Sequence, residues 1–116
     1  MRKHLLTYNM QKYDIILVNF PFSDLSQTKL RPALVVAQNK GDNCVLCQIT
    51  TKHRNINDFE LTLLQKDTIG NITFDSNIYV DMIFTLHKHL IVKHIGRVKS
   101  LLVKKNVSEK LTLLFA

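Results

Sequence analysis

Residues 13–37 read YDIILVNFPFSDLSQTKLRPALVVA, and this stretch decides the fold class. Its two ends, residues 13–20 and 32–37, are rich in β-branched and aromatic side chains, which is typical of strands. Pro32 opens the second run, at a position where a strand tolerates proline. The polar residues 22–31 predict an exposed loop of about ten residues, and loops of that length in small domains often carry function.

Further short runs continue this pattern along the chain. The predicted strands are residues 44–51, 59–63, 78–86 and 90–98, the last broken by Gly96, with turns at 39–43 and 66–71 and a polar loop at 52–58. The one convincing helix begins at Asn106, which can cap it, with Glu109 three positions later as in a capping box. Many strands followed by one helix predict a mostly β protein, a small antiparallel β-barrel or half-barrel with a C-terminal helix packed on it.

The length and composition fit one globular domain. The chain has 116 residues, of which 46% are hydrophobic and 22% charged, and this excludes disordered, collagen-like and coiled-coil proteins. We expect a single domain at residues 13–116 after an N-terminal extension at residues 1–12, with Met10 as an alternative start. No apolar run approaches the roughly 18 residues of a membrane-spanning helix, and the N-terminus lacks the apolar segment of a signal peptide. The sequence therefore predicts a cytoplasmic protein without a membrane partner.

The charge is strongly basic and unevenly distributed. Sixteen Lys and Arg against nine Asp and Glu give a net charge of +7. This favours an anionic partner, although a merely soluble basic protein has the same composition. Residues 82–108 hold no acidic side chain. Such a one-signed segment is typical of a phosphate-binding face, with Lys93, Arg97 and Lys99 as candidate contacts. The alternative is a solvated sheet edge, where lysine prevents aggregation.

Two cysteines and two closely spaced histidines raise the question of a redox or metal site. Cys44 and Cys47 form a C-x-x-C pair inside a predicted strand, where residues three apart point to opposite faces. No second such pair is present, so we expect two free structural thiols in a reducing compartment. His87 and His89 are expected on one strand face, but neither has an acidic or cysteine neighbour in sequence. We therefore predict no metal site.

A small polar set stands among the apolar strands. Its members are Arg31 at the entrance of a strand, Gln48 and Thr50 on one face of the third strand, and Tyr79, Asp81 and Thr85 on one face of the fifth. An aspartate in an apolar strand is costly unless it is paired or lies in a cleft. Arg31 is the natural partner of Asp81, either in a structural ion pair or as part of a site.

These features resemble the MazF/PemK toxin family over roughly residues 12–115. The likeness rests on the first strand followed by Lys29-Leu30-Arg31-Pro32-Ala33-Leu34-Val35-Val36, on Ile49-Thr50-Thr51, on residues 76–86 with Asp81 and Thr85, and on Ile95-Gly96-Arg97-Val98. The resemblance implies a homodimeric, SH3-like β-barrel of the MazF/PemK/CcdB type. It also implies a sequence-selective endoribonuclease that cleaves single-stranded mRNA without metal or other cofactor, as the toxin of a toxin–antitoxin pair that an acidic antitoxin holds inactive.

The resemblance also implies residue roles. The catalytic arginine of the family carries onto Arg31, its threonine onto Thr50, and the aspartate of the PemK branch onto Asp81. RNA supplies its own nucleophile, the 2′-OH. Arg31 can stabilise charge on the phosphate, Thr50 can donate a hydrogen bond to it, and Asp81 can accept the 2′-OH proton. The candidate RNA-binding residues are Gln48, Thr51, Tyr79, Thr85, Lys29, Lys93, Arg97 and Lys99.

Among its departures from the family pattern, the chain has Tyr79 and Phe84 where relatives carry arginine. Tyr79 can instead stack on a splayed base. These departures keep a second hypothesis open, in which the protein is a non-catalytic member of the same fold. Such a protein would bind nucleic acid or a protein target, as CcdB-type toxins do.

Overall fold

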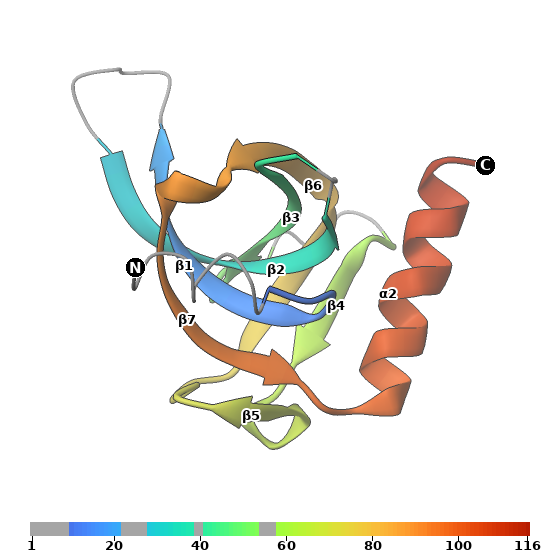
Figure 1. The fold of residues 1–116 in the computed structure, drawn as a ribbon. Coiled ribbons are helices and arrows are strands. Elements are labelled where there is room, and N and C mark those ends of the chain that lie inside the picture. The colour runs from blue at the N-terminus through green and yellow to red at the C-terminus, as the bar shows by residue number, and fades with distance from the viewer. Residues whose placement is uncertain (1–9, 22–27, 39–40, 54–57) are drawn as a thin grey trace.

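The computed structural model describes residues 10–21, 28–38, 41–53 and 58–116, and Figure 1 shows the course of the chain. Its elements are β1 (Asp14–Pro21), β2 (Thr28–Gln38), β3 (Asn43–Thr50), β4 (Glu60–Leu63), the 3-10 helix η1 (Gln65–Asp67), β5 (Thr68–Gly70), β6 (Ser76–His87), the 3-10 helix η2 (Lys88–Leu90), β7 (Ile91–Val98) and α2 (Leu101–Leu114). The sheet curls strongly, and α2 stands along one side of it next to β4 (Figure 1).

The prediction of a mostly antiparallel β fold with one C-terminal helix is confirmed. Seven strands form one sheet in the order β4-β6-β3-β2-β1-β7-β5. The sheet is not closed into a barrel, because no pairing within the described part of the chain joins β4 to β5 at its two ends. Both edge strands are short, with four and three residues, and each pairs with one neighbour only.

An apolar core lies on each face of this sheet. Ile15 and Leu34 belong to the core that α2 covers through Val107. Their neighbours Ile16 and Val35 belong to a second core on the opposite face. The central strands are therefore buried on both sides, which explains their continuous apolar runs. A slip of one residue would move every side chain to the other face, so the two cores together fix the register.

β2 begins at Thr28, earlier than expected, because its first residues pair with the end of β1. The loop expected over residues 22–31 is therefore wrong in its last part, and residues 22–27 lie outside the described residues. Arg31 consequently sits on a paired strand, which fixes the direction of its side chain more firmly than a loop would.

α2 begins at Leu101, ahead of the start predicted at Asn106. Ser100 caps the helix, since its Oγ accepts a hydrogen bond from the backbone N–H of Val103 at 3.2 Å. Leu101 and Leu102 are exposed, so they do not extend an apolar stripe that marks the helix in the sequence. In the described part of the chain, no helix combines the length and the apolar character needed to cross a membrane.

The turn expected at residues 66–71 is wrong, because η1 and β5 occupy this stretch and β5 pairs with β7. β7 continues as one strand through Gly96, although its pairing with β1 shifts register next to that glycine. Two glycines permit the close pairing. A Cβ on Gly70, whose φ is 115°, would lie 2.5 Å from the carbonyl oxygen of Ile95, and one on Gly96 would lie 2.4 Å from that of Ile69. Neither position has room for a side chain.

β6 carries a bulge that breaks the expected alternation of its side chains. Its pairing with β3 shifts in register near the middle of the strand. Val80 and Ile83 are three residues apart, yet both pack against the core that α2 covers. In a regular strand they would face opposite sides. The single strand face expected for Tyr79, Asp81 and Thr85 is therefore wrong.

The chain immediately ahead of β1 packs as part of the domain. Met10 is 2% exposed and belongs to the second core. The carboxylate of Asp14 is buried, accepts a hydrogen bond from the backbone N–H of Gln11 at 2.8 Å and lies 3.3 Å from Nε2 of His94. These contacts attach the chain to β7. Residues 1–9 of the expected N-terminal extension lie outside the described residues.

Replacing Gly96 by alanine is expected to lower the free energy of unfolding by about 1–3 kcal/mol, since the new methyl group overlaps the carbonyl oxygen of Ile69. Gly41→Ala is the matched control, because no atom lies within 4 Å of a Cβ at that position. Urea unfolding followed by circular dichroism measures both variants. Equal unfolding midpoints would show that β5 does not approach β7 as closely as described.

Candidate nucleic-acid interface

A surface pocket of about 300 Å³ lies where the start of β2 meets the end of β3. Its lining consists of Lys29, Leu30, Arg31 and Pro32 from β2, Ile49 and Thr50 from β3, Thr51 just after β3, and Phe74 from the connection that leads into β6. Arg31 and Thr50, two of the three predicted catalytic residues, are both in it. Lys29 and Thr51, two of the predicted RNA contacts, line the same pocket. It therefore combines cationic, hydroxyl and apolar groups.

The register between β2 and β3 places Arg31 beside Thr50. Ala33 lies opposite Gln48 at the last paired position of this ladder. Arg31 and Thr50 each lie two residues beyond that pair, so continuing the register sets them opposite each other. The alternation of side chains along a strand puts both on the face that carries Ala33 and Gln48. Two residues far apart in sequence thus face one space.

The hydroxyl of Thr50 is oriented by the backbone that follows it. Its Oγ1 accepts a hydrogen bond from the backbone N–H of Lys52 at 3.2 Å. A hydroxyl has one hydrogen to donate as well as lone pairs, so this contact leaves its O–H for a further acceptor such as a phosphate oxygen. β6 holds the same segment, since Tyr79 Oη and Asn77 Nδ2 donate to the carbonyl of Lys52 at 2.8 and 3.1 Å.

The two basic side chains of the pocket differ in exposure. Lys29 is exposed, whereas Arg31 is half-buried and also interacts within the protein. A charge with less water around it gains more from a bound counter-charge, because the local dielectric constant is lower. The guanidinium group of arginine also matches the geometry of a phosphate with two parallel hydrogen bonds. Arg31 is therefore the better placed of the two to bind a phosphate group specifically.

Asp81 is absent from the described residues that line this pocket. It is half-buried on β6 at the bulge and also interacts within the protein. Its carboxylate lies close enough to Cys47 to help raise the pKa of that thiol. The ion pair of Asp81 with Arg31 stays a prediction.

Tyr79 and Phe84, where the family resemblance implies arginine, pack against the interior of this protein. Tyr79 is 7% exposed, and its hydroxyl is engaged by the carbonyl of Lys52. Phe84 packs against the second core and stacks on Phe20, with 4.4 Å between ring centroids. A base could stack on Tyr79 only after its ring had left this position. The burial argues against the stacking role predicted for Tyr79.

Two other predicted RNA contacts lie at different distances from the pocket. Gln48 is half-buried on the face of β3 that also carries Thr50. Thr85 is exposed toward the far end of β6, opposite Val45, and is not part of the pocket lining among the described residues. The bulge in β6 separates Thr85 from the polar residues near the end of β3.

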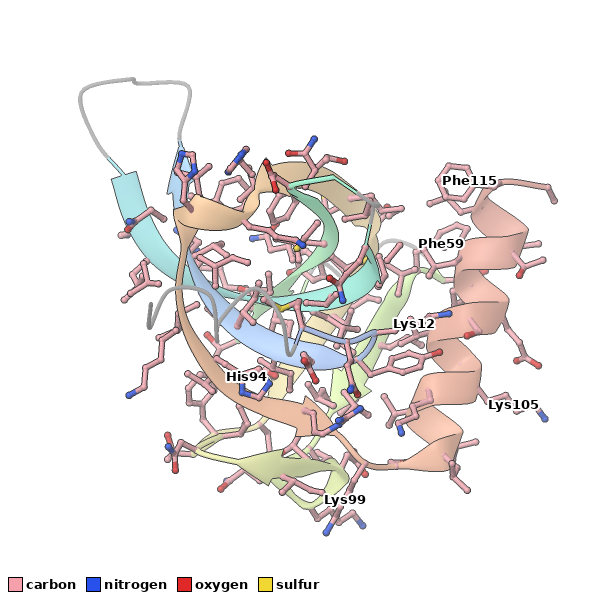
Figure 2. All side chains as sticks on the ribbon, in the orientation of Figure 1. Lys12, Phe59, His94, Lys99, Lys105 and Phe115 are labelled. Carbon is pink, nitrogen blue, oxygen red and sulfur yellow. The ribbon has the colours of Figure 1, made fainter. Side chains whose placement is uncertain are left out.

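Of the exposed lysines at β7 and just after it, Lys93 lies across β1 from the pocket. Lys93 is opposite Leu17 of β1, which in turn is opposite Pro32 of the pocket wall. Neighbouring strands are about 4.8 Å apart, so Lys93 stands about 10 Å across the sheet from that wall. Lys99 follows β7 and its side chain points outward near the β5 end of the sheet (Figure 2).

Arg97, by contrast, is engaged by a buried carboxylate. Its Nη1 lies 3.8 Å from Oδ1 of Asp14 and donates a hydrogen bond to Oε1 of Gln11 at 3.1 Å. Asp14 is 1% exposed, so removing its cationic partners would leave a buried charge uncompensated. Arg97 is therefore less available for a phosphate than Lys93 or Lys99.

The histidines predicted to share a strand face do not do so. His87 ends β6, and His89 lies in η2, so the strand stops between them. Their rings pack with centroids 3.9 Å apart. In the part of the chain that the structure describes, no group of three or more His, Cys, Asp or Glu side chains is arranged to hold a metal ion.

The two cysteines lie in different cores, which confirms that they point to opposite faces of β3. Cys47 packs in the core under α2, and Cys44 packs in the second core. Both thiols are free and buried. Burial raises both pKa values, and burial together with the charge of Asp81 raises the pKa of Cys47 to about 12. Neither thiol has the environment of a reactive cysteine.

The comparison with known proteins agrees with the fold. A family model described as the PemK-like, MazF-like toxin of type II toxin–antitoxin systems matches residues 11–115. The chain belongs to this family. No curated protein sequence matches it.

Several solved structures share the fold. MazF (Form-I) from Deinococcus radiodurans has a TM-score of 0.72 at 20% identity, over 93% of this chain and 97% of that one. Mycobacterium tuberculosis toxin MazF-mt6 has a TM-score of 0.69 at 17% identity, over 88% and 95%. An endoribonuclease in complex with its cognate antitoxin from a mycobacterial species has a TM-score of 0.65 at 15% identity, over 91% and 94%. At these identities the likeness shows the fold.

Sequence reasoning missed the apolar part of the pocket. Leu30 and Phe74 are 49% and 45% exposed and both line it. Phe74 is the one aromatic residue in the otherwise mostly polar stretch 71–77, but this isolation does not by itself place it in a site. The apolar residue draws no attention in a motif search, because motifs are read from charged and nucleophilic side chains.

The thiols of the folded protein are expected to react very slowly with a disulfide reagent near neutral pH. The thiolate is the reactive form, and a pKa of about 12 for Cys47 leaves almost none of it. Asp81→Asn should lower that pKa only slightly, because burial is the larger cause. Absorbance of the released chromophore measures the rate, with urea-unfolded protein as the control. Rapid reaction of the folded protein would contradict the buried placement of both thiols.

Proposed function

We propose that this protein is a sequence-selective, metal-independent endoribonuclease that cleaves single-stranded mRNA and acts as the toxin of a toxin–antitoxin pair. The observation that carries the proposal is the pocket, which joins Arg31, Lys29 and Thr50 in a chain of the PemK-like, MazF-like toxin family. Two mycobacterial structural neighbours bear the name endoribonuclease.

In the proposed reaction, the 2′-OH of one nucleotide attacks the adjacent phosphorus and displaces the 5′-oxygen of the next. Negative charge then grows on the non-bridging phosphate oxygens. Arg31 stabilises this charge through paired hydrogen bonds, and its half-buried position strengthens the effect. Thr50 donates its O–H to the same phosphate, and exposed Lys29 neutralises a neighbouring one. The products are a 2′,3′-cyclic phosphate and a free 5′-OH.

Asp81 is the proposed acceptor of the 2′-OH proton, either directly or by orienting the group that takes it. General base catalysis of this kind contributes on the order of 10²–10⁴-fold in rate. Asp81 lies outside the pocket lining among the described residues. Catalytic contacts are often long without substrate and tighten when it binds. A bulge in β6 at this point is a place where the strand can adjust.

We further propose that the protein is a cytoplasmic homodimer whose protein partner is an acidic antitoxin. The net charge of +7 and the absence of acidic side chains from residues 82–108 support a partner of opposite charge. Structural neighbours include an endoribonuclease in complex with its cognate antitoxin and MazE-MazF (Form-II) from Deinococcus radiodurans.

A second candidate function is a non-catalytic module that binds nucleic acid or a protein target through the same pocket. The burial of Tyr79 and the packing of Phe84 on Phe20 favour it, because the family resemblance implies arginine at both positions. The pocket would then bind a phosphate group but lack part of the positive charge that stabilises the transition state of cleavage.

Arg31→Ala is expected to lower the rate of RNA cleavage by about 10²–10³-fold, because it removes the main stabilisation of the developing charge. Thr50→Ala and Asp81→Asn should lower it less. The assay incubates long single-stranded RNA with protein in EDTA at low salt and maps the fragment ends. Wild type should give discrete cuts that end in 2′,3′-cyclic phosphate.

Thr62→Ala, an exposed threonine of β4 outside the pocket, is the matched control for Thr50→Ala and should cleave like wild type. Equal activity in the Arg31, Thr50 and Asp81 variants would mean that the site lies elsewhere. RNA left intact by wild type, with growth inhibition that persists in Arg31→Ala, would favour the binding module.

The double variant Lys93→Ala/Lys99→Ala is expected to weaken RNA binding and to flatten its salt dependence. If each lysine contacts one phosphate, the slope of log K against log salt should fall by about 1.4, at about 0.7 per phosphate of a single strand. The matched control replaces Lys66 and Lys105, which are equally exposed but lie on η1 and α2. Fluorescence anisotropy over a salt series measures both. An unchanged slope would remove β7 from the RNA-binding face.

A further inference from the structure

The pocket at the start of β2 has a chemical make-up that phosphate binding alone does not require. Leu30 and Phe74, each nearly half exposed, line the same space as Lys29 and Arg31. Apolar surface left in water beside two cations is typical of a site whose ligand has an anionic part and a flat apolar part. A nucleotide has both, because its phosphate is charged and its base presents a π face.

The connection that carries Phe74 is anchored on both sides. Ahead of it, the backbone N–H of Asn71 donates to a β7 carbonyl at 2.8 Å. After it, Oδ1 of Asp75 accepts from the backbone N–H of Gln65 at 2.9 Å. β6 begins directly afterwards at buried Ser76. A ring held by such an anchored segment loses little conformational entropy when a ligand binds to it.

Phe74 also lies at the boundary between the pocket and the interior. Phe74, Pro32 and Ile49 line the pocket and, in addition, a small apolar hollow of about 20 Å³ beneath it. These three residues form an apolar wall that belongs to the same lining as Lys29 and Arg31. A flat ring that enters the pocket therefore meets apolar surface while its charged substituent remains near Arg31.

We propose that this wall is a nucleobase subsite, in which Phe74 stacks on one base of single-stranded RNA while Arg31 holds a neighbouring phosphate. The inference rests on the proposed function and deepens it, because it assigns a residue that selects unpaired RNA. In a duplex the bases stack on one another and present no free face. Tyr79, the residue that the sequence suggested for this role, is buried, whereas the ring of Phe74 is accessible.

Binding of a short single-stranded RNA carrying 2′-O-methyl groups tests the subsite, because this RNA lacks the nucleophilic 2′-OH and stays intact. Phe74→Ala is expected to weaken binding by about 5- to 150-fold, the range that corresponds to loss of one stacked base. Phe74→Tyr should restore the affinity. Phe74→Leu should not, because leucine keeps apolar volume but has no π face. Fluorescence anisotropy at fixed salt gives the dissociation constants.

Phe115→Ala is the matched control, since Phe115 is also an exposed phenylalanine but lies at the end of α2, outside the pocket lining (Figure 2). It should bind the RNA as wild type does. The same RNA annealed to its complement is the second control, and wild type and Phe74→Ala should bind that duplex equally. Unfolding midpoints of all variants separate loss of binding from loss of fold.

Three outcomes would overturn the subsite. They are equal affinity of Phe74→Ala and Phe115→Ala, restoration by Phe74→Leu as complete as by Phe74→Tyr, and no binding of single-stranded RNA by wild type. A different outcome separates the subsite from the proposed function. If binding depends on Phe74 but RNA with free 2′-OH groups stays uncut, the subsite stands and the proposed cleavage fails.

Discussion

The pairing of β2 with β3, with Ala33 opposite Gln48, is the constraint on which the rest of the structure depends. Both strands bury side chains on both faces, so a slip of one residue would exchange the contents of the two cores. It would also turn the side chain of Gln48 into the apolar core under α2. A buried amide without hydrogen-bond partners destabilises a protein by about 1–3 kcal/mol. The register that the cores select is the one that sets Arg31 and Thr50 on one face. The geometry of the pocket is therefore a consequence of core packing.

The other walls of the pocket are fixed by equally local constraints. Tyr79 and Asn77 hold the carbonyl of Lys52 and so fix the chain that follows β3. Gly70 and Gly96 let β5 approach β7 so closely that the connection leading to β6 has a defined start. Each of these contacts is part of the folded protein itself. A site preorganised in this way does not have to be ordered when a ligand binds, which favours both affinity and charge stabilisation.

The elements that sequence reasoning identified are those whose signal is local. The runs at residues 13–20 and 44–51 are mostly apolar and rich in β-branched side chains, and their strands appear nearly where expected. The sequence did not indicate the start of α2, because the leucines of the first turn, which Ser100 caps, face solvent and form no apolar stripe. The bulge in β6 was not predicted for another reason. The bulge lets Val80 and Ile83 pack in the same core, and the spacing of apolar residues in the sequence does not indicate this shift.

The residues of the site also differ in whether the sequence indicates them, and the difference has a physical reason. Arg31 and Thr50 could be found because charge and hydroxyl chemistry stand out against apolar strands. Phe74 could not, since its role depends on a surface formed by three segments distant in sequence. Cations alone attract any polyanion, and a protein with a net charge of +7 would bind duplex and single strands through phosphate contacts. Preference for unpaired RNA must come from a surface that meets bases. In this pocket the exposed ring of Phe74 is the group that can supply it, and it is the part of the site that charge and motif could not reveal.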